Sequence, residues 1–155
     1  MSTRTGDVGV SRTMALVATA SVLLVVASAF AQPKPAPALP DTSAGKRAAG
    51  WLAAFSSGDD ARMRQYFSDN LAPEAIEQRS IEDRLATIRA MRTDLGTLEL
   101  RKVVQAGESW VVVVVASRDE FVQLAFELEP QPPHRLLRVR VEPTEDPDLP
   151  PPPKV

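Results

Sequence analysis

The chain has 155 residues, with 18 Lys and Arg against 20 Asp and Glu, one His, no Cys and 14 Pro. This length leaves room for one compact domain and excludes a multidomain enzyme. The absence of Cys excludes disulfides, thiolate metal sites and a cysteine nucleophile, and a single His excludes a multi-histidine metal cluster. We therefore predict that the protein uses no metal and no other cofactor.

Residues 1–31 have the layout of a secretory signal peptide. An uncharged apolar stretch, Met14–Ala31, follows a leader that contains Arg4 and Arg12, and it ends in the A-x-A pattern of a cleavage site. Cleavage after Ala31 predicts a secreted or periplasmic protein that meets the membrane only during export. The alternative is an uncleaved anchor, because the 18 residues of this stretch approach the roughly 20 needed to span a bilayer.

Ten of the 14 prolines fall into two stretches that bound the domain. Residues 32–42 form a linker rich in Pro and Ala, which we interpret as an extended spacer because proline lacks an amide donor. Residues 144–155 form an acidic, Pro-rich tail that we predict to be disordered. Between residues 43 and 142 there are 14 basic and 15 acidic groups. The predicted domain, residues 43–143, therefore lacks the positive surplus that a nucleic-acid partner requires.

The first half of this domain predicts three or four helices, because its apolar residues recur every three or four positions. Helix starts are indicated by capping residues or by a proline, and helix stops are indicated by glycine. The predicted starts are Asp41-Thr42-Ser43, Asp59-Asp60, Pro73 and Ser80, and the predicted stops are Gly58 and Gly96.

From Thr97 onward the apolar pattern changes to a period of two, which predicts strands. Their short connections demand antiparallel neighbours, so the sheet is a meander. Helices followed by a meander predict an α+β domain with its helices on one face of the sheet. In the last strand Leu137, Val139 and Val141 are predicted to share a face. The four predicted strands are Thr97–Gln105, Trp110–Ser117, Phe121–Leu128 and Arg135–Glu142.

The second predicted strand is apolar on both faces, as expected for a strand that is covered on both sides. The helices can cover only one face. The other face therefore needs a sheet-to-sheet homodimer, a partner domain or strong curling of the sheet. We favour the homodimer, because closed twofold pairs are the commonest soluble assemblies. The candidate interface residues are Val111, Val113, Val115 and Phe121.

Two stretches of the domain resemble a known superfamily. They are W-L-A-A-F-x-S-G-D at Trp51–Asp59 and E-P-x-P-P-H-R at Glu129–Arg135. Together with the order of helices and strands, they resemble the nuclear-transport-factor-2-like superfamily, which includes ketosteroid-isomerase-like and SnoaL-like folds. More narrowly, residues 43–143 look like the small domain ahead of secreted serine hydrolases, both beta-lactamase-like enzymes and tail-specific peptidases. The resemblance implies a curved, cone-like sheet around a pocket, pairing through the outside of the sheet, and a serine hydrolase as partner.

Two functions are compatible with these patterns. We favour a non-catalytic binding or dimerisation module, accessory to a serine hydrolase, and we assign no catalytic residue. The alternative is a small pocket enzyme with isomerase- or hydratase-like acid–base chemistry on an apolar ligand. The candidate pocket residues are Trp51, Phe55, Tyr66, Phe67 and His134.

Basic residues on the predicted sheet admit two interpretations. Arg138 and Arg140, with Arg101 or Lys102, form either an anion-binding face or a set of edge charges that resist strand pairing.

Overall fold

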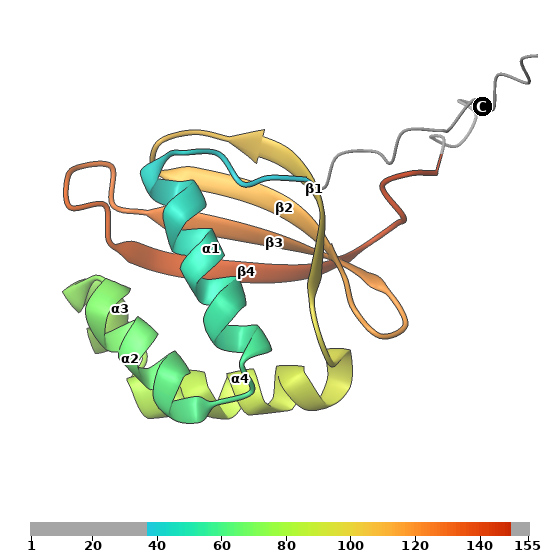
Figure 1. Cartoon of the computed structure of the whole chain (residues 1–155). Helices are drawn as coiled ribbons and strands as arrows, with labels where there is room; N and C mark the ends of the chain where they lie inside the picture. Colours follow the sequence, from blue (N-terminus) through green and yellow to red (C-terminus); the bar gives the residue numbers. More distant parts are fainter. Residues whose placement is uncertain (1–36, 150–155) are drawn as a thin grey trace, which may run out of the picture. The chain divides into compact units, whose positions relative to one another are not determined.

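The structure, a computed structural model, describes residues 37–149 (Figure 1). The predicted signal peptide, its cleavage site and the end of the predicted tail lie outside the described residues, so export and cleavage stay predictions. Within residues 37–149, no helix combines the length and the hydropathy needed to cross a bilayer. The described elements are α1 (Ser43–Ser56), α2 (Asp60–Asn70), α3 (Pro73–Gln78), α4 (Ile81–Leu95), β1 (Glu99–Ala106), β2 (Trp110–Ala116), β3 (Phe121–Leu128) and β4 (Leu136–Thr144).

The helices precede one antiparallel sheet with the strand order β1-β2-β3-β4. This arrangement confirms the predicted α+β class with N-terminal helices. Helix α1 packs on β2 and β3, α3 packs on β4, and α2 joins α1 to α4. Figure 1 shows all four helices on the same side of the sheet, with α1 lying over β2 and β3.

Side-chain oxygens cap three of these helices where the sequence indicates. Each oxygen accepts a hydrogen bond from a backbone amide of the first turn that has no partner inside the helix. Helix α3 instead starts with Pro73, whose missing N–H would be unpaired at that position. The capping pairs are Thr42 with Gly45 (3.1 Å), Asp59 with Ala61 (2.8 Å) and Ser80 with Asp83 (3.1 Å).

Gly96 ends α4 and turns the chain into β1. Its φ of +71° lies in the region that residues with a Cβ seldom adopt. This confirms the stop that the sequence predicts. Helix α1 ends at Ser56, two residues before the other predicted stop, Gly58.

The inner face of the sheet carries the core. Val111, Val113 and Val115 of β2 are 0% exposed, and they form one cluster with the inward residues of β3 and with the helices. This result corrects the predicted interface, because a fully buried side chain has no surface to offer a second chain. Strand β2 consists almost entirely of valine, so its composition does not reveal which alternate positions point inward.

The outer face of β2 carries Val112, Val114 and Ala116. Val114 is only 4% exposed, although no helix covers it. Its cross-strand neighbours are Lys102 on β1 and Gln123 on β3, which are long side chains able to lie over a valine. Phe121, the fourth predicted interface residue, pairs with Ala116 and is half-buried.

A register shift in the pairing of β3 with β4 means that one residue predicted to point inward does not. Leu128 pairs with Leu136, whereas Glu127 pairs with Arg138, so Leu137 is the extra residue of a bulge. Leu136 is therefore the residue buried in the core, at 1% exposed. The prediction that Leu137 shares a face with Val139 and Val141 misses this extra residue.

Because successive residues of β2 point to opposite faces, the same Val→Ala change should lower the free energy of unfolding by different amounts at neighbouring positions. Val113→Ala removes two methyl groups from a fully buried site and is expected to lower the free energy of unfolding by about 2 kcal/mol. Val112→Ala, on the half-exposed outer face, is expected to cost less than about 1 kcal/mol. Urea unfolding followed by circular dichroism measures both. Equal costs for the two variants would contradict the assignment of the inner face.

Candidate functional site

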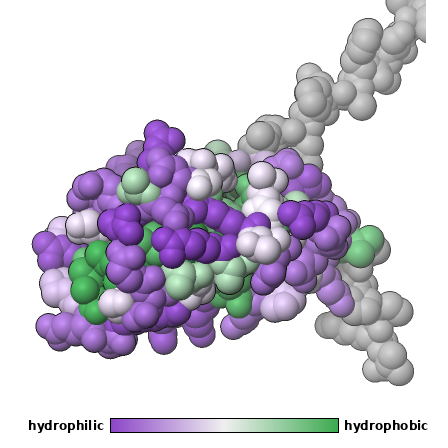
Figure 2. All heavy atoms as spheres, turned by 90° about the horizontal axis from the view of Figure 1, so that it is seen from below, coloured by the Kyte–Doolittle hydropathy of each residue, from purple (hydrophilic) through white to green (hydrophobic). Residues whose placement is uncertain are grey.

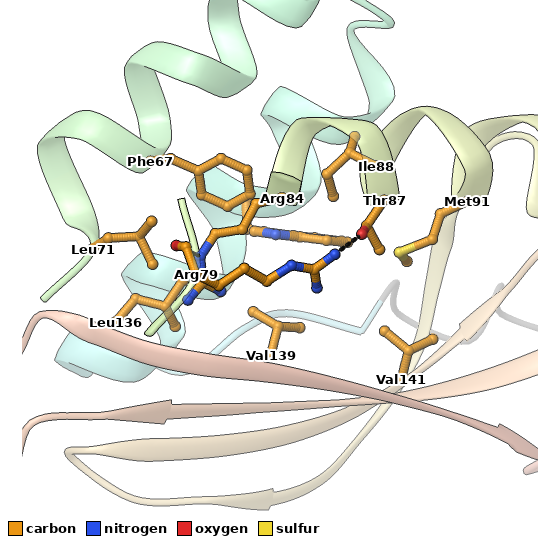
Figure 3. Close-up of a pocket in the computed structure, with 11 residues that line it drawn as sticks. Phe67, Leu71, Arg79, Arg84, Thr87, Ile88, Met91, Leu136, Val139 and Val141 are labelled. Carbon is orange, nitrogen blue, oxygen red and sulfur yellow. Dashed lines mark hydrogen bonds between the residues drawn. The ribbon is translucent and has the colours of Figure 1, made fainter. Parts of the chain in front are cut away.

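A cavity of about 90 Å³ lies between α4 and β4 (Figure 3). Most of its lining is apolar and comes from three helices, β4 and the segment after α2. Its polar lining consists of two arginines and one threonine. The lining residues are Trp51, Phe67, Leu71, Arg79, Arg84, Thr87, Ile88, Met91, Leu136, Val139 and Val141.

The indole of Trp51 forms the inner wall of this cavity. It is 2% exposed, stacks on Phe55 with ring centroids 5.2 Å apart, and meets the edge of Phe126 on β3 at 5.7 Å. Aromatic contacts on two sides hold the ring in place. The inner wall is therefore rigid, and a molecule in the cavity would lie directly against a tryptophan.

The polar side of the cavity consists of Arg79, Arg84 and Thr87. The Nη2 of Arg84 donates to the Ala75 carbonyl at 2.6 Å, and its Nε donates to the Arg79 carbonyl at 3.2 Å. The Nη2 of Arg79 donates to the Asp83 carbonyl at 3.1 Å and to the Thr87 hydroxyl. Figure 3 shows the Arg79 side chain extending across the pocket toward Thr87.

The two arginines leave this side of the cavity positively charged. In the part of the chain that the structure describes, neither Arg79 nor Arg84 forms an ion pair. Burial and the nearby charge of Arg79 both lower the pKa of the Arg84 guanidinium. An anion at this position would relieve the repulsion between the two cations. The arginines that do form ion pairs are Arg64, Arg89, Arg92, Arg101, Arg138 and Arg140.

Three of the five predicted pocket residues lie at or beside this cavity. Trp51 and Phe67 line it, and Phe55 stacks behind Trp51. Tyr66 instead lines a groove between α1 and α2, where its hydroxyl donates to the Arg47 carbonyl at 2.8 Å. Burial raises the pKa of this phenol, so Tyr66 keeps its proton and serves as a packed hydrogen-bond donor.

The fifth predicted pocket residue, His134, lies in the turn between β3 and β4. Its Nδ1 is 2.9 Å from the Glu129 carbonyl, and its backbone amide donates to the Gln131 carbonyl at 3.0 Å. These contacts fit a structural role in the turn. His134 is not among the residues that line the cavity.

The basic residues of the sheet are engaged with acids. Arg138 and Arg140 each lie 2.6 Å from a carboxylate oxygen of Glu127. Burial raises the pKa of Glu127, but the two arginines outweigh it and hold that pKa below its usual value. Arg101 pairs with Glu99 at 3.8 Å and with Asp148 at 3.6 Å. Of the two sequence interpretations, these ion pairs favour edge charges over an anion-binding face.

The two arginines of the cavity are not among the predicted site residues, although the sequence holds a signal for them. Arg79 directly precedes the cap residue Ser80, and Arg84 follows the first turn of α4. A helix start carries a partial positive charge that favours acids over bases. The helix start therefore does not account for two arginines at this place. Both side chains instead line the same cavity.

No group of three or more His, Cys, Asp or Glu side chains suited to a metal ion occurs within residues 37–149. No protein-family model, curated protein or solved structure matches this chain.

The environment of Tyr66 predicts a structural effect for one substitution. Tyr66→Phe removes the buried hydroxyl that donates to the Arg47 carbonyl and is expected to lower the free energy of unfolding by about 1 kcal/mol. Thr93→Val is the matched control, because its hydroxyl donates to the Arg89 carbonyl in an exposed position where water can replace it. Urea unfolding measures both, and a Tyr66→Phe variant as stable as the parent would contradict the assigned role.

Proposed function

We propose that this chain is an exported, non-catalytic binding module whose ligand places a short apolar group in the cavity between α4 and β4. The observation that carries the proposal is the lining itself, which is apolar on most sides and backed by Trp51. An apolar cavity with a few polar groups at one side is the usual form of a small-molecule site.

The size of the cavity restricts the ligand. At about 90 Å³ it is smaller than an engineered cavity of about 150 Å³ that binds benzene. A linear alkyl chain has a small cross-section and can enter a space of this size end-on. We therefore expect a short, unbranched tail.

The lining favours binding over the alternative of a small pocket enzyme. Acid–base catalysis needs a group that gains and loses a proton near the working pH. The cavity offers two guanidinium groups, which keep their protons, and one hydroxyl, and its lining includes no Asp, Glu or His. Tyr66 and His134, the titratable residues that the sequence suggested, are engaged elsewhere.

The resemblance to a known superfamily suggests how such a binding module would be used. We propose a member of the nuclear-transport-factor-2-like superfamily that acts after export as an accessory to a serine hydrolase. The four helices ahead of an antiparallel sheet support this assignment, because they keep the element order on which the resemblance depends.

The proposal predicts a chain-length series for binding. The chain has two tryptophans, so Trp110→Phe makes Trp51 the single reporter of the cavity. Titrating this full-length variant with linear alcohols from butan-1-ol to octan-1-ol should shift Trp51 fluorescence. Affinity should rise about fourfold per added CH₂, corresponding to about 0.8 kcal/mol, until the cavity is full and the increase stops.

A pair of matched variants tests where the alcohol binds. Val139→Phe places a large ring in the lining of the cavity, whereas Val104→Phe makes the same change at an exposed site on β1. Val139→Phe should weaken binding at least tenfold, and Val104→Phe should leave it unchanged. A series without chain-length dependence, or full binding by Val139→Phe, would refute the cavity as the site.

We further propose that two copies of the chain pair through the outer face of the sheet. Trp110 is 41% exposed there, at the edge of a hollow lined by Val112, Ala125 and Leu137. Its ring lies over Gly107, where a Cβ would stand 2.6 Å from the indole nitrogen. The exposed ring and the hollow share one face, so a twofold axis can bring this apolar surface of two copies together.

Light scattering on the full chain tests this pairing. The dimer mass is expected at 50 µM protein, and Trp110→Ala should give the monomer. Val104→Ser is the control, because Val104 is exposed on β1 and does not line the hollow. A monomer mass for the parent chain at this concentration would contradict the proposal.

A further inference from the structure

The arginines beside the cavity have N–H groups that donate to no protein acceptor within residues 37–149. A guanidinium carries five N–H groups. Arg84 uses two of its groups on the Ala75 and Arg79 carbonyls, through Nη2 and Nε. Arg79 directs only its Nη2 to protein acceptors, the Asp83 carbonyl and the Thr87 hydroxyl. Within residues 37–149, the hydrogen bonds of both side chains thus leave Nη1 of each without a protein partner.

The two acids that directly precede Arg84 in the sequence do not neutralise these charges. Glu82 pairs with Arg64 at 3.0 Å, on the exposed side of α4. The Asp83 carboxylate accepts from the Ser80 hydroxyl at 2.7 Å, as part of the helix cap. The repulsion between Arg79 and Arg84 is therefore not balanced by the carboxylates beside them.

Polar side chains dominate the surface on the side of the domain that carries the helices. Figure 2 views the domain from the helix side and shows a predominantly hydrophilic surface, with hydrophobic side chains visible in gaps between polar ones. A ligand that binds this cavity must satisfy both an apolar interior and a charged border.

We propose that the ligand carries a carboxylate that binds Arg79 and Arg84 while its short alkyl tail occupies the cavity. This inference rests on the proposed function, and it adds the head group to the tail already argued. Guanidinium and carboxylate groups are both planar and match in paired hydrogen bonds, which neither an alcohol nor an amine can reproduce. The border charge also disfavours a cationic head group.

A series of three ligands with the same tail tests the head group. Hexanoate, hexan-1-ol and hexylammonium are titrated at pH 7 into the full-length Trp110→Phe variant, with Trp51 fluorescence as the readout. Hexanoate should bind about tenfold more tightly than hexan-1-ol, and hexylammonium should bind most weakly. In 0.5 M NaCl the advantage of hexanoate should shrink, because salt screens charges at an open site.

Two arginine variants assign the effect to the cavity. Arg79→Gln should reduce the preference for hexanoate over hexan-1-ol about fivefold, and the ratio of the two affinities is the quantity compared. Arg62→Gln removes a positive charge from the groove between α1 and α2 instead. It should leave the affinities for hexanoate and hexan-1-ol unchanged. Urea unfolding of Arg79→Gln checks that the variant is folded under the binding conditions. Arg84→Lys keeps the charge, loses the planar fork and should also reduce the preference.

The outcomes separate this inference from the proposed function. If hexan-1-ol and hexanoate bind equally well, or if Arg79→Gln keeps the full preference, the carboxylate inference is overturned while the cavity stands as a site for alkyl tails. If none of the three ligands changes Trp51 fluorescence, the proposed function itself fails. A preference for hexylammonium would overturn the head-group argument directly.

Discussion

Trp51 packs between Phe55 on its own helix and Phe126 on the sheet, at ring distances of 5.2 and 5.7 Å. This contact joins α1 to the inner face of the sheet, and the remaining helices are placed against the assembly that it forms. The same ring is the inner wall of the cavity. Loss of this packing would therefore affect the fold and the site together, because one side chain serves both.

One-sided coverage of the sheet explains the rest of the architecture. The inner positions of β2 are sealed by helices, whereas Val114 on the outer face lies between Lys102 and Gln123 on the neighbouring strands. The helices do not close completely over β4. The gap beside α4 is bordered by Arg79 and Arg84, which hold the ends of α3 and α4 together through backbone carbonyls. The guanidinium groups that join α3 to α4 thus also present charge to the cavity.

Capping residues, helix stops and apolar periodicity predict the order and type of the helices and strands. The caps Thr42, Asp59 and Ser80 and the stop at Gly96 were readable because capping depends on residues close in sequence. The inward side of β2 was not readable, since its valines are equivalent until the helices select one face. The bulge at Leu137 and the shared position of the two arginines depend on pairing and packing between elements, which local periodicity does not encode.

The central claim is that the cavity between α4 and β4 is where this protein takes a ligand. Methyl-resolved NMR spectra of the full chain, recorded during a titration with pentan-1-ol, test it most directly. The claim predicts shifts that concentrate on Ile88, Met91 and Val139, which line the cavity, and no change at Val112 or Val114 on the outer face. Shifts that gather on the outer valines, with the cavity methyls unchanged, would contradict it.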